Sequence, residues 1–461
     1  MENRNKSPFA ETSQVTSPIH DKHALMGMKI ESVEADGQSA RVNTTGAAFV
    51  FDLPNDAIIC SQKIPRRRKV ATIHGLSLKC LKPVSKTPDR CVFGETAEQE
   101  TLVVSADSLL TISLAPGATV DITGSYRPAW EGQESNCLFL PDETGGVGLY
   151  LIGNGSGTKP VSKDTEWTVN YQTASSSKLL VSVFPPRPFD IQQSGETLLH
   201  SFSWRRPYPS DQELAAWRPI GSVLALHSWI WQGSQGSTYG IEQDDSWATM
   251  AFVPKDAQEL QRVVEAAHRL GMKVIPYMSP YYFGNPGGQV VKSTLGRFLN
   301  TVQDVLSQYG FDGVYYDGLY AGDIDGSYYL SRRTRQMIGD GKILVLHSTN
   351  MPLSNLPCPF IDTYATYLLR GENRPWDDQY VRWNVTSYNL GNSIGLLSYE
   401  TCRLSPEVID RLLSLNARLP YWVQDGTWYH LKYYPSADEL NLINAEYFPK
   451  LKNLLRDPGR R

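Results

Sequence analysis

The sequence predicts a β-sandwich followed by a (β/α)₈ barrel, and two patterns indicate this fold. Between about residues 25 and 190, short β-rich runs are separated by Gly, Pro, Asn and Asp, and no long helical period intervenes, which is typical of a sandwich. Between about residues 191 and 461, apolar strand-like runs alternate with amphipathic helices, which indicates a parallel sheet. Seven or eight such units in about 260 residues fit a closed barrel better than an open sheet.

The first 190 residues are predicted to hold a tail and the sandwich. Residues 1–24 are polar and lack periodicity, so we expect them to form a mobile tail. Within 25–190 the clearest strand candidates are 28–33, 47–53, 101–104, 109–113, 118–123, 147–152 and 179–184. Because no helical period separates these runs, they are assigned to a single β-sandwich domain.

The barrel half, residues 191–461, contains strands that alternate with helices. The strand candidates are 198–204 (the least distinct), 223–229, 273–278, 313–316, 343–347, 361–367, 394–400 and 421–425. The clearest helix begins at Asp256, where Glu259 completes a capping box, and it ends at Gly271. Further helices are predicted over 295–309 and after the caps Ser405 and Ser436. No Gly-rich phosphate-binding motif follows any strand, which argues against a nucleotide-binding doubly wound fold.

The composition argues against several classes of protein. The formal net charge of −4 argues against a nucleic-acid binder, and the short basic run 65–69 reads as a solvated turn rather than a recognition patch. The six Cys show no CxxC or Cys/His ligand spacing, which argues against a zinc site. No window approaches the roughly 18 apolar residues of a membrane-spanning helix. No apolar signal-peptide core is visible, so a cytoplasmic location is expected, although an exported protein with its leader removed would look the same.

The run 311–318, Phe-Asp-Gly-Val-Tyr-Tyr-Asp-Gly, ends a predicted strand in the carboxylate Asp317. In a βα-barrel, catalytic groups lie at the C-terminal ends of strands, because there the loops form an open face. The candidate substrate-binding residues at or near the strand ends are His227, Trp229, Trp231, Tyr277, Tyr316, His347, Tyr364 and Asp425. Aromatic rings suit sugars because they stack on C–H faces and offer polar edges, while packing is the alternative role of any such ring.

Several carboxylates accompany these rings, and together they describe a glycosidase pocket. One carboxylate attacks or stabilises an oxocarbenium-like centre, and a second protonates the leaving oxygen. Asp317 is the candidate nucleophile, and capping of the following loop is its alternative role. Glu372 is the candidate acid/base, with a surface carboxylate as the alternative. Glu400 is the rival acid/base, and Asp425 is a third candidate whose Asp-Gly pair also suits a turn.

Other polar residues near the strands have a structural interpretation as well as a functional one. Asp362 begins its predicted strand, which favours a structural role. His347 either binds a sugar, orients a carboxylate, or is a satisfied structural group. Arg332, Arg333 and Arg335 read as a solvated helix face, from which one side chain is able to reach an active-site carboxylate.

Several stretches carry a resemblance to a known family. They are 252–257 with 267–277, 310–317, 346–349 and 360–372 in the barrel half, and 139–150 in the sandwich. With these stretches the chain resembles the retaining α-galactosidase-like and α-glucosidase-like glycoside hydrolases, especially their uncharacterised relatives. The resemblance implies a supersandwich-like N-terminal domain before a catalytic TIM barrel. It also implies that Asp317, ending the fourth strand, is the nucleophile, and that Glu372, after the sixth, is the acid/base.

The sequence therefore predicts a glycosidase that cleaves an α-linked bond, with retention of configuration. A carbohydrate-binding protein that keeps the pocket without turnover is the alternative. A metal-dependent barrel hydrolase is disfavoured, because no His-x-His or His/Asp ligand cluster falls on a predicted strand end. We expect no cofactor, an oligosaccharide or glycoside as the partner, and neither a nucleic acid nor a membrane.

Overall fold

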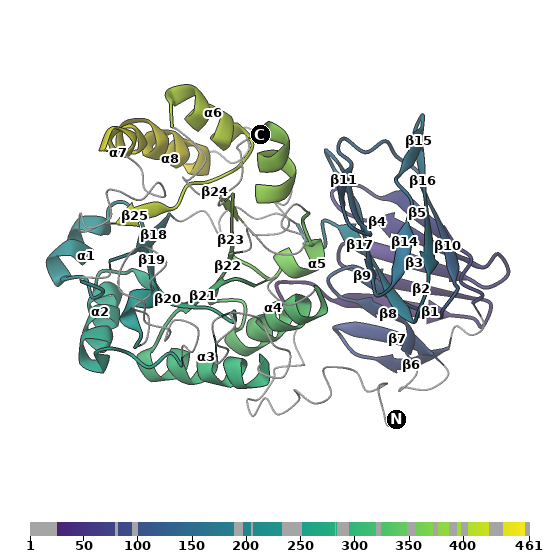
Figure 1. The fold of residues 1–461 in the computed structure, drawn as a ribbon, viewed down its shortest axis with the longest axis horizontal. Coiled ribbons are helices and arrows are strands. Elements are labelled where there is room, and N and C mark those ends of the chain that lie inside the picture. The colour runs from purple at the N-terminus through teal and green to yellow at the C-terminus, as the bar shows by residue number, and fades with distance from the viewer. Residues whose placement is uncertain are drawn as a thin grey trace.

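The computed structural model describes residues 25–78, 82–94, 100–188, 197–203, 206–232, 251–281, 283, 295–319, 324–347, 356–371, 377–386, 394–397, 404–423 and 437–456. Two antiparallel sheets stand beside a curled parallel sheet that has helices on its outside (Figure 1). Within these ranges, no helix has both the length and the apolar character needed to cross a membrane.

The first antiparallel sheet has nine strands in the order β1-β2-β3-β4-β5-β10-β16-β14, with β15 paired to β16. Their bounds are β1 Ile30–Ala35, β2 Ser39–Thr44, β3 Ala47–Asp52, β4 Ala57–Gln62, β5 Arg68–His74, β10 Thr119–Gly124, β14 Gly155–Gly157, β15 Val161–Lys163 and β16 Glu166–Thr173. The second has eight strands in the order β11-β12-β13-β17-β9-β8-β7-β6. Their bounds are β6 Pro83–Lys86, β7 Arg90–Gly94, β8 Glu100–Ser105, β9 Leu109–Leu114, β11 Gly132–Glu134, β12 Cys137–Asp142, β13 Gly145–Ile152 and β17 Ser177–Phe184.

Period-two burial explains why these strands form two packed layers. In β16, exposed positions alternate with the buried Trp167, Val169 and Tyr171. These side chains share one core with Phe93 and Val181 of the other sheet. The prediction of a β-rich, multi-stranded first half is therefore confirmed.

The parallel sheet has eight strands in the order β24-β23-β22-β21-β20-β19-β18-β25. Their bounds are β18 Leu198–Ser201, β19 Val223–Leu226, β20 Lys273–Met278, β21 Gly313–Asp317, β22 Ile343–His347, β23 Tyr367–Arg370, β24 Ile394–Leu397 and β25 Tyr421–Val423. The least distinct predicted strand therefore exists, as β18. Within the described residues, β24 and β25 are not paired with each other. The structure therefore shows a curled parallel sheet, and its closure into the predicted barrel stays a prediction.

Helices follow most of the parallel strands. Their bounds are α1 Asp211–Trp217, α2 Ala257–Arg269, α3 Leu295–Tyr309, α4 Ile324–Ile338, α5 Pro359–Asp362, α6 Pro406–Ser414, α7 Ala437–Leu442 and α8 Phe448–Arg456, with a 3₁₀ turn, η2 Ser228–Ile230, and π-helical turns η6 Tyr380–Val385 and η9 Ile443–Tyr447. Asp256 caps α2 by accepting from the backbone N–H groups of Gln258 and Glu259. Ser405 caps α6. Both predicted starts are confirmed.

One predicted strand is wrong. The range 361–367 begins inside the short helix α5, and β23 starts only at Tyr367. Pro359 occupies the first turn of α5, where its fixed φ suits a helix and its missing N–H breaks no hydrogen bond. The strand expected over 361–367 is therefore replaced at its start by a helical turn, because a short apolar run suits either period.

The sandwich lies against the side of the parallel sheet that carries α4 and α5 (Figure 1). The Tyr150 hydroxyl of β13 donates to the backbone oxygen of Pro357 at 2.5 Å. Arg187, which follows β17, donates to the backbone oxygen of Thr363 at 2.7 Å. The division into domains at about residue 190 stays a prediction, but the two halves share buried hydrogen bonds.

Candidate active site at the strand ends

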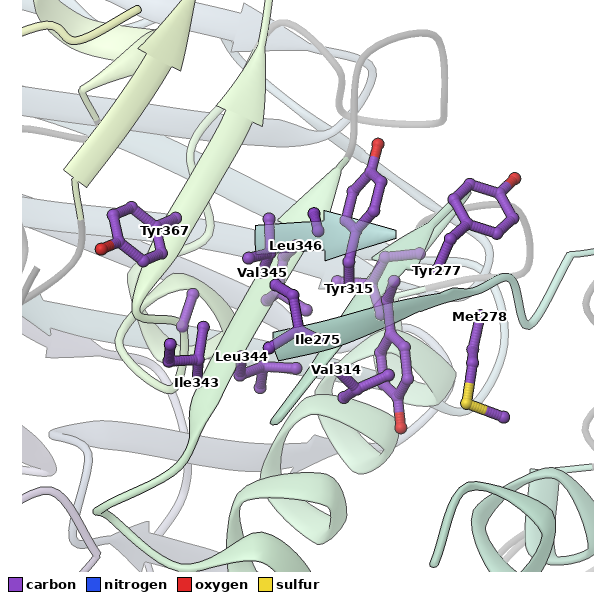
Figure 2. Packing of buried hydrophobic residues seen from close by; sticks show 14 of the residues in the cluster. Ile275, Tyr277, Met278, Val314, Tyr315, Ile343, Leu344, Val345, Leu346 and Tyr367 are labelled. Atoms are coloured by element: carbon purple, nitrogen blue, oxygen red, sulfur yellow. The ribbon is translucent and has the colours of Figure 1, made fainter. Parts of the chain in front are cut away.

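The carboxyl ends of β20, β21 and β22 bring a group of polar side chains together. Asp317 is in register with His347 on the next strand, and Tyr277 is in register with Tyr315. Figure 2 shows the rings of Tyr277 and Tyr315 pointing the same way from adjacent strands. Because alternate residues of a strand share a face, Tyr315 and Asp317 lie on the same side of the sheet.

Both carboxyl oxygens of Asp317 have hydrogen-bond partners. The Tyr277 hydroxyl donates to Oδ2 at 2.6 Å. His347 Nδ1 lies 2.9 Å from Oδ1. The backbone is fixed as well, because the Ser279 hydroxyl donates to the Asp317 carbonyl oxygen at 2.8 Å. The carboxylate is therefore held in one orientation by groups from the two neighbouring strands.

The same contacts decide the ionisation of Asp317. Burial alone would raise its pKa, but attraction from His347 and hydrogen bonds from His347, Tyr277 and the Gly318 backbone outweigh it and lower the pKa. The side chain keeps 29% of its surface exposed, so the carboxylate is accessible. An ionised, oriented and accessible carboxylate suits nucleophilic attack or the stabilisation of a developing positive charge.

His347 connects Asp317 to a second tyrosine. Its Nδ1 also lies 2.8 Å from the Tyr315 hydroxyl. With a proton on Nδ1, the imidazole donates toward the Asp317 carboxylate and the Tyr315 oxygen together. His347 is 11% exposed, so this bond is shielded from water. The geometry makes His347 a group that orients Asp317, one of the roles that the sequence left open.

Two further histidines, His200 and His227, pack against the tyrosines around Asp317. His200 of β18 lies between the rings of Trp422, at 4.2 Å between centroids, and Tyr315, at 5.2 Å. Burial, and then the nearby His347, lower the pKa of His200 to about 3, against the attraction of Asp317. His227 packs on Tyr277 at 4.4 Å, and burial followed by the other two histidines lowers its pKa well below the ordinary value. Both imidazoles are therefore neutral at neutral pH.

The structure brings some predicted substrate-binding residues to Asp317 and not others. His227, Tyr277 and His347 belong to the cluster around it. Trp229 is 2% exposed and packs edge-on against Phe202. Trp231 is fully buried and donates to the Tyr277 backbone oxygen at 2.6 Å. Glu372, Glu400 and Asp425 lie outside the described residues.

Tyr316 and Tyr364 point away from Asp317. The Tyr316 hydroxyl lies 2.8 Å from Thr334 Oγ1 of α4, on the helix side of the sheet. Tyr364 follows α5 and donates to Asp107 of the sandwich at 2.7 Å. Their placement does not support the predicted contact with substrate, because one faces the outer helices and the other faces the other domain.

The sequence reading missed two members of the cluster. Tyr315 was overlooked in favour of Tyr316, although strand alternation from Asp317 identifies Tyr315 as its neighbour on the same face. His200 was overlooked because it lies in the least distinct strand. The only feature of the sequence that indicates His200 is its position in the strand β18.

Of the three arginines predicted to form a solvated helix face, Arg335 is buried, and Arg332 and Arg333 are half-buried. Arg335 is fully buried and donates to the backbone oxygens of Tyr364, Gly339 and Lys342. Arg332 pairs with Asp89 of the sandwich. Asp362 forms a buried ion pair with Arg370 at 2.8 Å, which agrees with its structural reading. Within the described ranges, no group of three or more His, Cys, Asp or Glu side chains is arranged to hold a metal ion.

No protein-family model matches the sequence, and no curated protein matches it. Among similar solved structures, a GH31 dextranase of Flavobacterium johnsoniae complexed with glucose is 7% identical, with a TM-score of 0.43 over 94% of this chain and 68% of that one. A noncanonic maltogenic α-amylase of Thermotoga neapolitana is 10% identical, with a TM-score of 0.38 over 57% of this chain and 77% of that one. An uncharacterized protein of Listeria monocytogenes is 9% identical, with a TM-score of 0.41 over 93% of this chain and 54% of that one. Similarities this distant assign neither a family nor an activity.

Proposed function

We propose that this protein is a glycoside hydrolase that cleaves an α-linked glycosidic bond with retention of configuration, and that Asp317 is its nucleophile. The observation that carries the proposal is the state of Asp317 at the end of β21. Its pKa is lowered, its side chain is accessible, and its two oxygens are bonded by Tyr277 and His347. Such a carboxylate stays ionised in neutral and weakly acidic solution, as a nucleophile requires.

The proposed reaction has two steps. First, an Asp317 oxygen bonds to the anomeric carbon while the bond from that carbon to the leaving oxygen breaks. A carboxylic acid gives its proton to the leaving oxygen, and Glu372 is the first candidate, with Glu400 and Asp425 as alternatives from the sequence. Water then attacks the anomeric carbon and gives a proton to the same carboxylate, and Asp317 is released. Retention requires the two carboxyl groups to lie about 5–5.5 Å apart.

The proposed sugar site uses the residues around Asp317. We assign contacts with sugar hydroxyl groups to Tyr277, His227 and His347, whose polar atoms lie at the strand ends. Trp229 and Trp231 are assigned packing roles rather than sugar contacts, because their rings are buried. The substrate class is an oligosaccharide or glycoside, and closure of the parallel sheet into a (β/α)₈ barrel is part of the same proposal.

The test compares the wild type with Asp317→Ala on a panel of 4-nitrophenyl α-glycosides. We expect kcat/KM of the variant to fall by a factor on the order of a thousand or more. Azide should restore turnover of the variant by taking the place of the missing carboxylate, and the product should be the β-glycosyl azide. Asp312→Asn is the matched control, since Asp312 precedes β21 at its other end and bonds to His268 and to the Val274 backbone.

The outcomes separate the proposed enzyme from its alternative. A wild type that turns over none of these substrates, yet binds oligosaccharides in calorimetry, would instead be a carbohydrate-binding protein. Equal loss of activity in Asp312→Asn and Asp317→Ala would contradict the role of Asp317. If proton NMR shows that the first product has the inverted anomeric configuration, Asp317 is not a nucleophile and acts as a base instead.

A further inference from the structure

A carboxylate of the sandwich is buried against the helices of the parallel sheet. Asp107 lies in the turn between β8 and β9 and is 1% exposed. Its Oδ2 accepts from the hydroxyl of Tyr328 at 2.7 Å and from the hydroxyl of Tyr364 at 2.7 Å. Tyr328 belongs to α4, and Tyr364 follows α5. One carboxyl oxygen therefore joins two separate segments of the other half of the molecule.

An ion pair strengthens the same contact. Arg332, one helical turn after Tyr328, pairs with Asp89 in the turn between β6 and β7. The two sandwich turns are bonded to each other, because the Ala106 N–H donates to the Asp89 backbone oxygen at 2.8 Å. Burial raises the pKa of Asp107, against the attraction of Arg332 and the two tyrosine hydrogen bonds. The contact is thus a polar cluster in the interface, where each lost partner leaves a buried polar group unsatisfied.

The segment that Tyr328 belongs to is connected to the Asp317 strand. The Ser327 hydroxyl donates to the Leu319 backbone oxygen at 3.0 Å, two residues after Asp317. The Thr334 hydroxyl of α4 bonds with Tyr316, the residue before Asp317. Helix α4 therefore contacts the end of β21 from both sides of Asp317.

The segment that Tyr364 belongs to leads into β23. Arg335 of α4 donates twice to the Tyr364 backbone oxygen, at 2.9 and 2.8 Å, and once to Thr366 Oγ1. Strand β23 then ends at Arg370, two positions before Glu372. Of the two tyrosines that meet at Asp107, Tyr328 therefore lies on the helix that follows β21, and Tyr364 lies three residues before β23 begins.

We infer that Asp107 is a positioning residue, through which the sandwich holds the end of β21 and the end of β23 at the separation that catalysis needs. This inference rests on the proposed function for its catalytic part. The sandwich is then part of the framework of the active site, rather than an independent sugar-binding module. Positioning errors of about 1 Å far from the reacting atoms are known to lower rates by up to about a hundredfold.

The experiment uses the full chain and four variants. Asp107→Leu removes the acceptor, Asp107→Asn keeps an acceptor oxygen and removes the charge, and Tyr328→Phe removes one donor. Tyr126→Phe is the matched control, because Tyr126 is a buried tyrosine within the sandwich whose hydroxyl donates to the Leu140 backbone oxygen and accepts from the Val147 N–H. The readouts are amide hydrogen exchange of peptides covering 324–338 and 359–371, and kcat and KM on whichever 4-nitrophenyl α-glycoside the wild type hydrolyses.

We expect exchange in both peptides to become about tenfold faster in Asp107→Leu, and to change less in Asp107→Asn. We expect kcat to fall about tenfold or more in Asp107→Leu with KM nearly constant. Tyr126→Phe should leave both peptides and kcat as in the wild type. Faster exchange in the 359–371 peptide of Tyr328→Phe would show that the two segments are joined through Asp107.

Two results would overturn the inference. If hydrogen exchange in both peptides of Asp107→Leu is the same as in the wild type, Asp107 does not hold the two segments together. If Asp107→Leu exchanges faster but has the same kcat as Tyr126→Phe, Asp107 joins the two segments without affecting catalysis. If the wild type hydrolyses none of the glycosides, the proposed function fails, and the exchange data alone decide whether Asp107 joins the two segments.

Discussion

Tyr315 and Tyr316 are consecutive in β21, and their hydroxyl groups lie on opposite sides of the parallel sheet. The Tyr315 hydroxyl is 2.8 Å from His347 Nδ1, and the Tyr316 hydroxyl is 2.8 Å from Thr334 Oγ1. Only Tyr315 shares a face with Asp317, so only Tyr315 belongs to the candidate active site. This pair allows a comparison in which the chemical change is the same and the side of the sheet differs.

Tyr315→Phe should lower kcat, because His347 loses one of its two partners at Nδ1 and orients Asp317 less well. We expect a decrease of about tenfold, corresponding to one hydrogen bond of about 1.4 kcal/mol. Tyr316→Phe should lower kcat much less, because its hydroxyl does not contact His347 or Asp317, and it should lower the free energy of unfolding by about 1 kcal/mol. Steady-state kinetics and urea unfolding measure the two effects, and equal loss of kcat in both variants would contradict the assignment.

Tyr277→Phe should move the acidic limb of the pH profile of kcat/KM to higher pH. The hydroxyl of Tyr277 bonds to the ionised form of Asp317 and helps to lower its pKa. Without this donor the pKa rises, so the nucleophile is protonated earlier as the pH falls. The limb of Tyr208→Phe, which removes a hydroxyl bonded to the Ile230 backbone oxygen, should stay where it is.

The same lowered pKa has a consequence for stability. A carboxyl group with a lowered pKa in the folded state stabilises the fold above its ordinary pKa, and this contribution is lost as the pH falls through the folded value. We expect wild type to lose stability relative to Asp317→Asn below about pH 4. Urea unfolding at a series of pH values measures the difference. Parallel curves for the two proteins would show that the pKa of Asp317 is not lowered.

His200→Phe should make the protein less sensitive to acid. The pKa of His200 is lowered from 6.5 to about 3, so the unfolded chain takes up a proton in a pH range where the folded protein does not. The contribution of His200 to the free energy of unfolding is therefore complete above its ordinary pKa. It declines between pH 6.5 and about 3, by at most about 1.4 kcal/mol per pH unit. Urea unfolding of the wild type and of His200→Phe across this pH range measures the decline. A variant His200→Phe with an unchanged decline would refute this explanation.

Arg335→Met should destabilise the protein by about 3 kcal/mol, because several buried backbone oxygens lose their donors at once. The guanidinium group donates to the backbone oxygens of Tyr364, Gly339 and Lys342 at 2.9, 2.9 and 2.6 Å, and to Thr366 Oγ1 at 3.2 Å. Arg333→Met, on the same helix, removes a partly exposed side chain, and we expect less than about 1 kcal/mol. The urea midpoints of the two variants give the comparison, and similar midpoints would argue against the buried role of Arg335.

The sequence reveals most of the fold where local signals are strong. The cap at Asp256 and the Ser405-Pro406 start are readable because the side chains that form them are adjacent in the chain. The error at 361–367 arose because a short apolar run fits a helix and a strand equally well. Closure of the parallel sheet has no local signal, since it depends on strands far apart in the chain.

The candidate site is predictable in part for the same reason. Asp317 is visible because a carboxylate ends an apolar strand before a glycine. Tyr315 follows from alternation once Asp317 is chosen, whereas His200 joins them only through the order of the strands. The bonds of Asp107 to Tyr328 and Tyr364 join positions that are distant in the sequence, so no pattern along the chain indicates them.

The pairing of β18 with β25 determines when the parallel sheet is completed during synthesis. Leu199 is in register with Tyr421, so one edge of β18 has its partner only after that last strand has left the ribosome. Until then, the backbone N–H and C=O groups of that edge are available to other chains. Contacts between such distant positions also form slowly. The nascent chain therefore passes through a stage in which the parallel sheet lacks this strand, and chaperones that cover exposed strand edges would act at that stage.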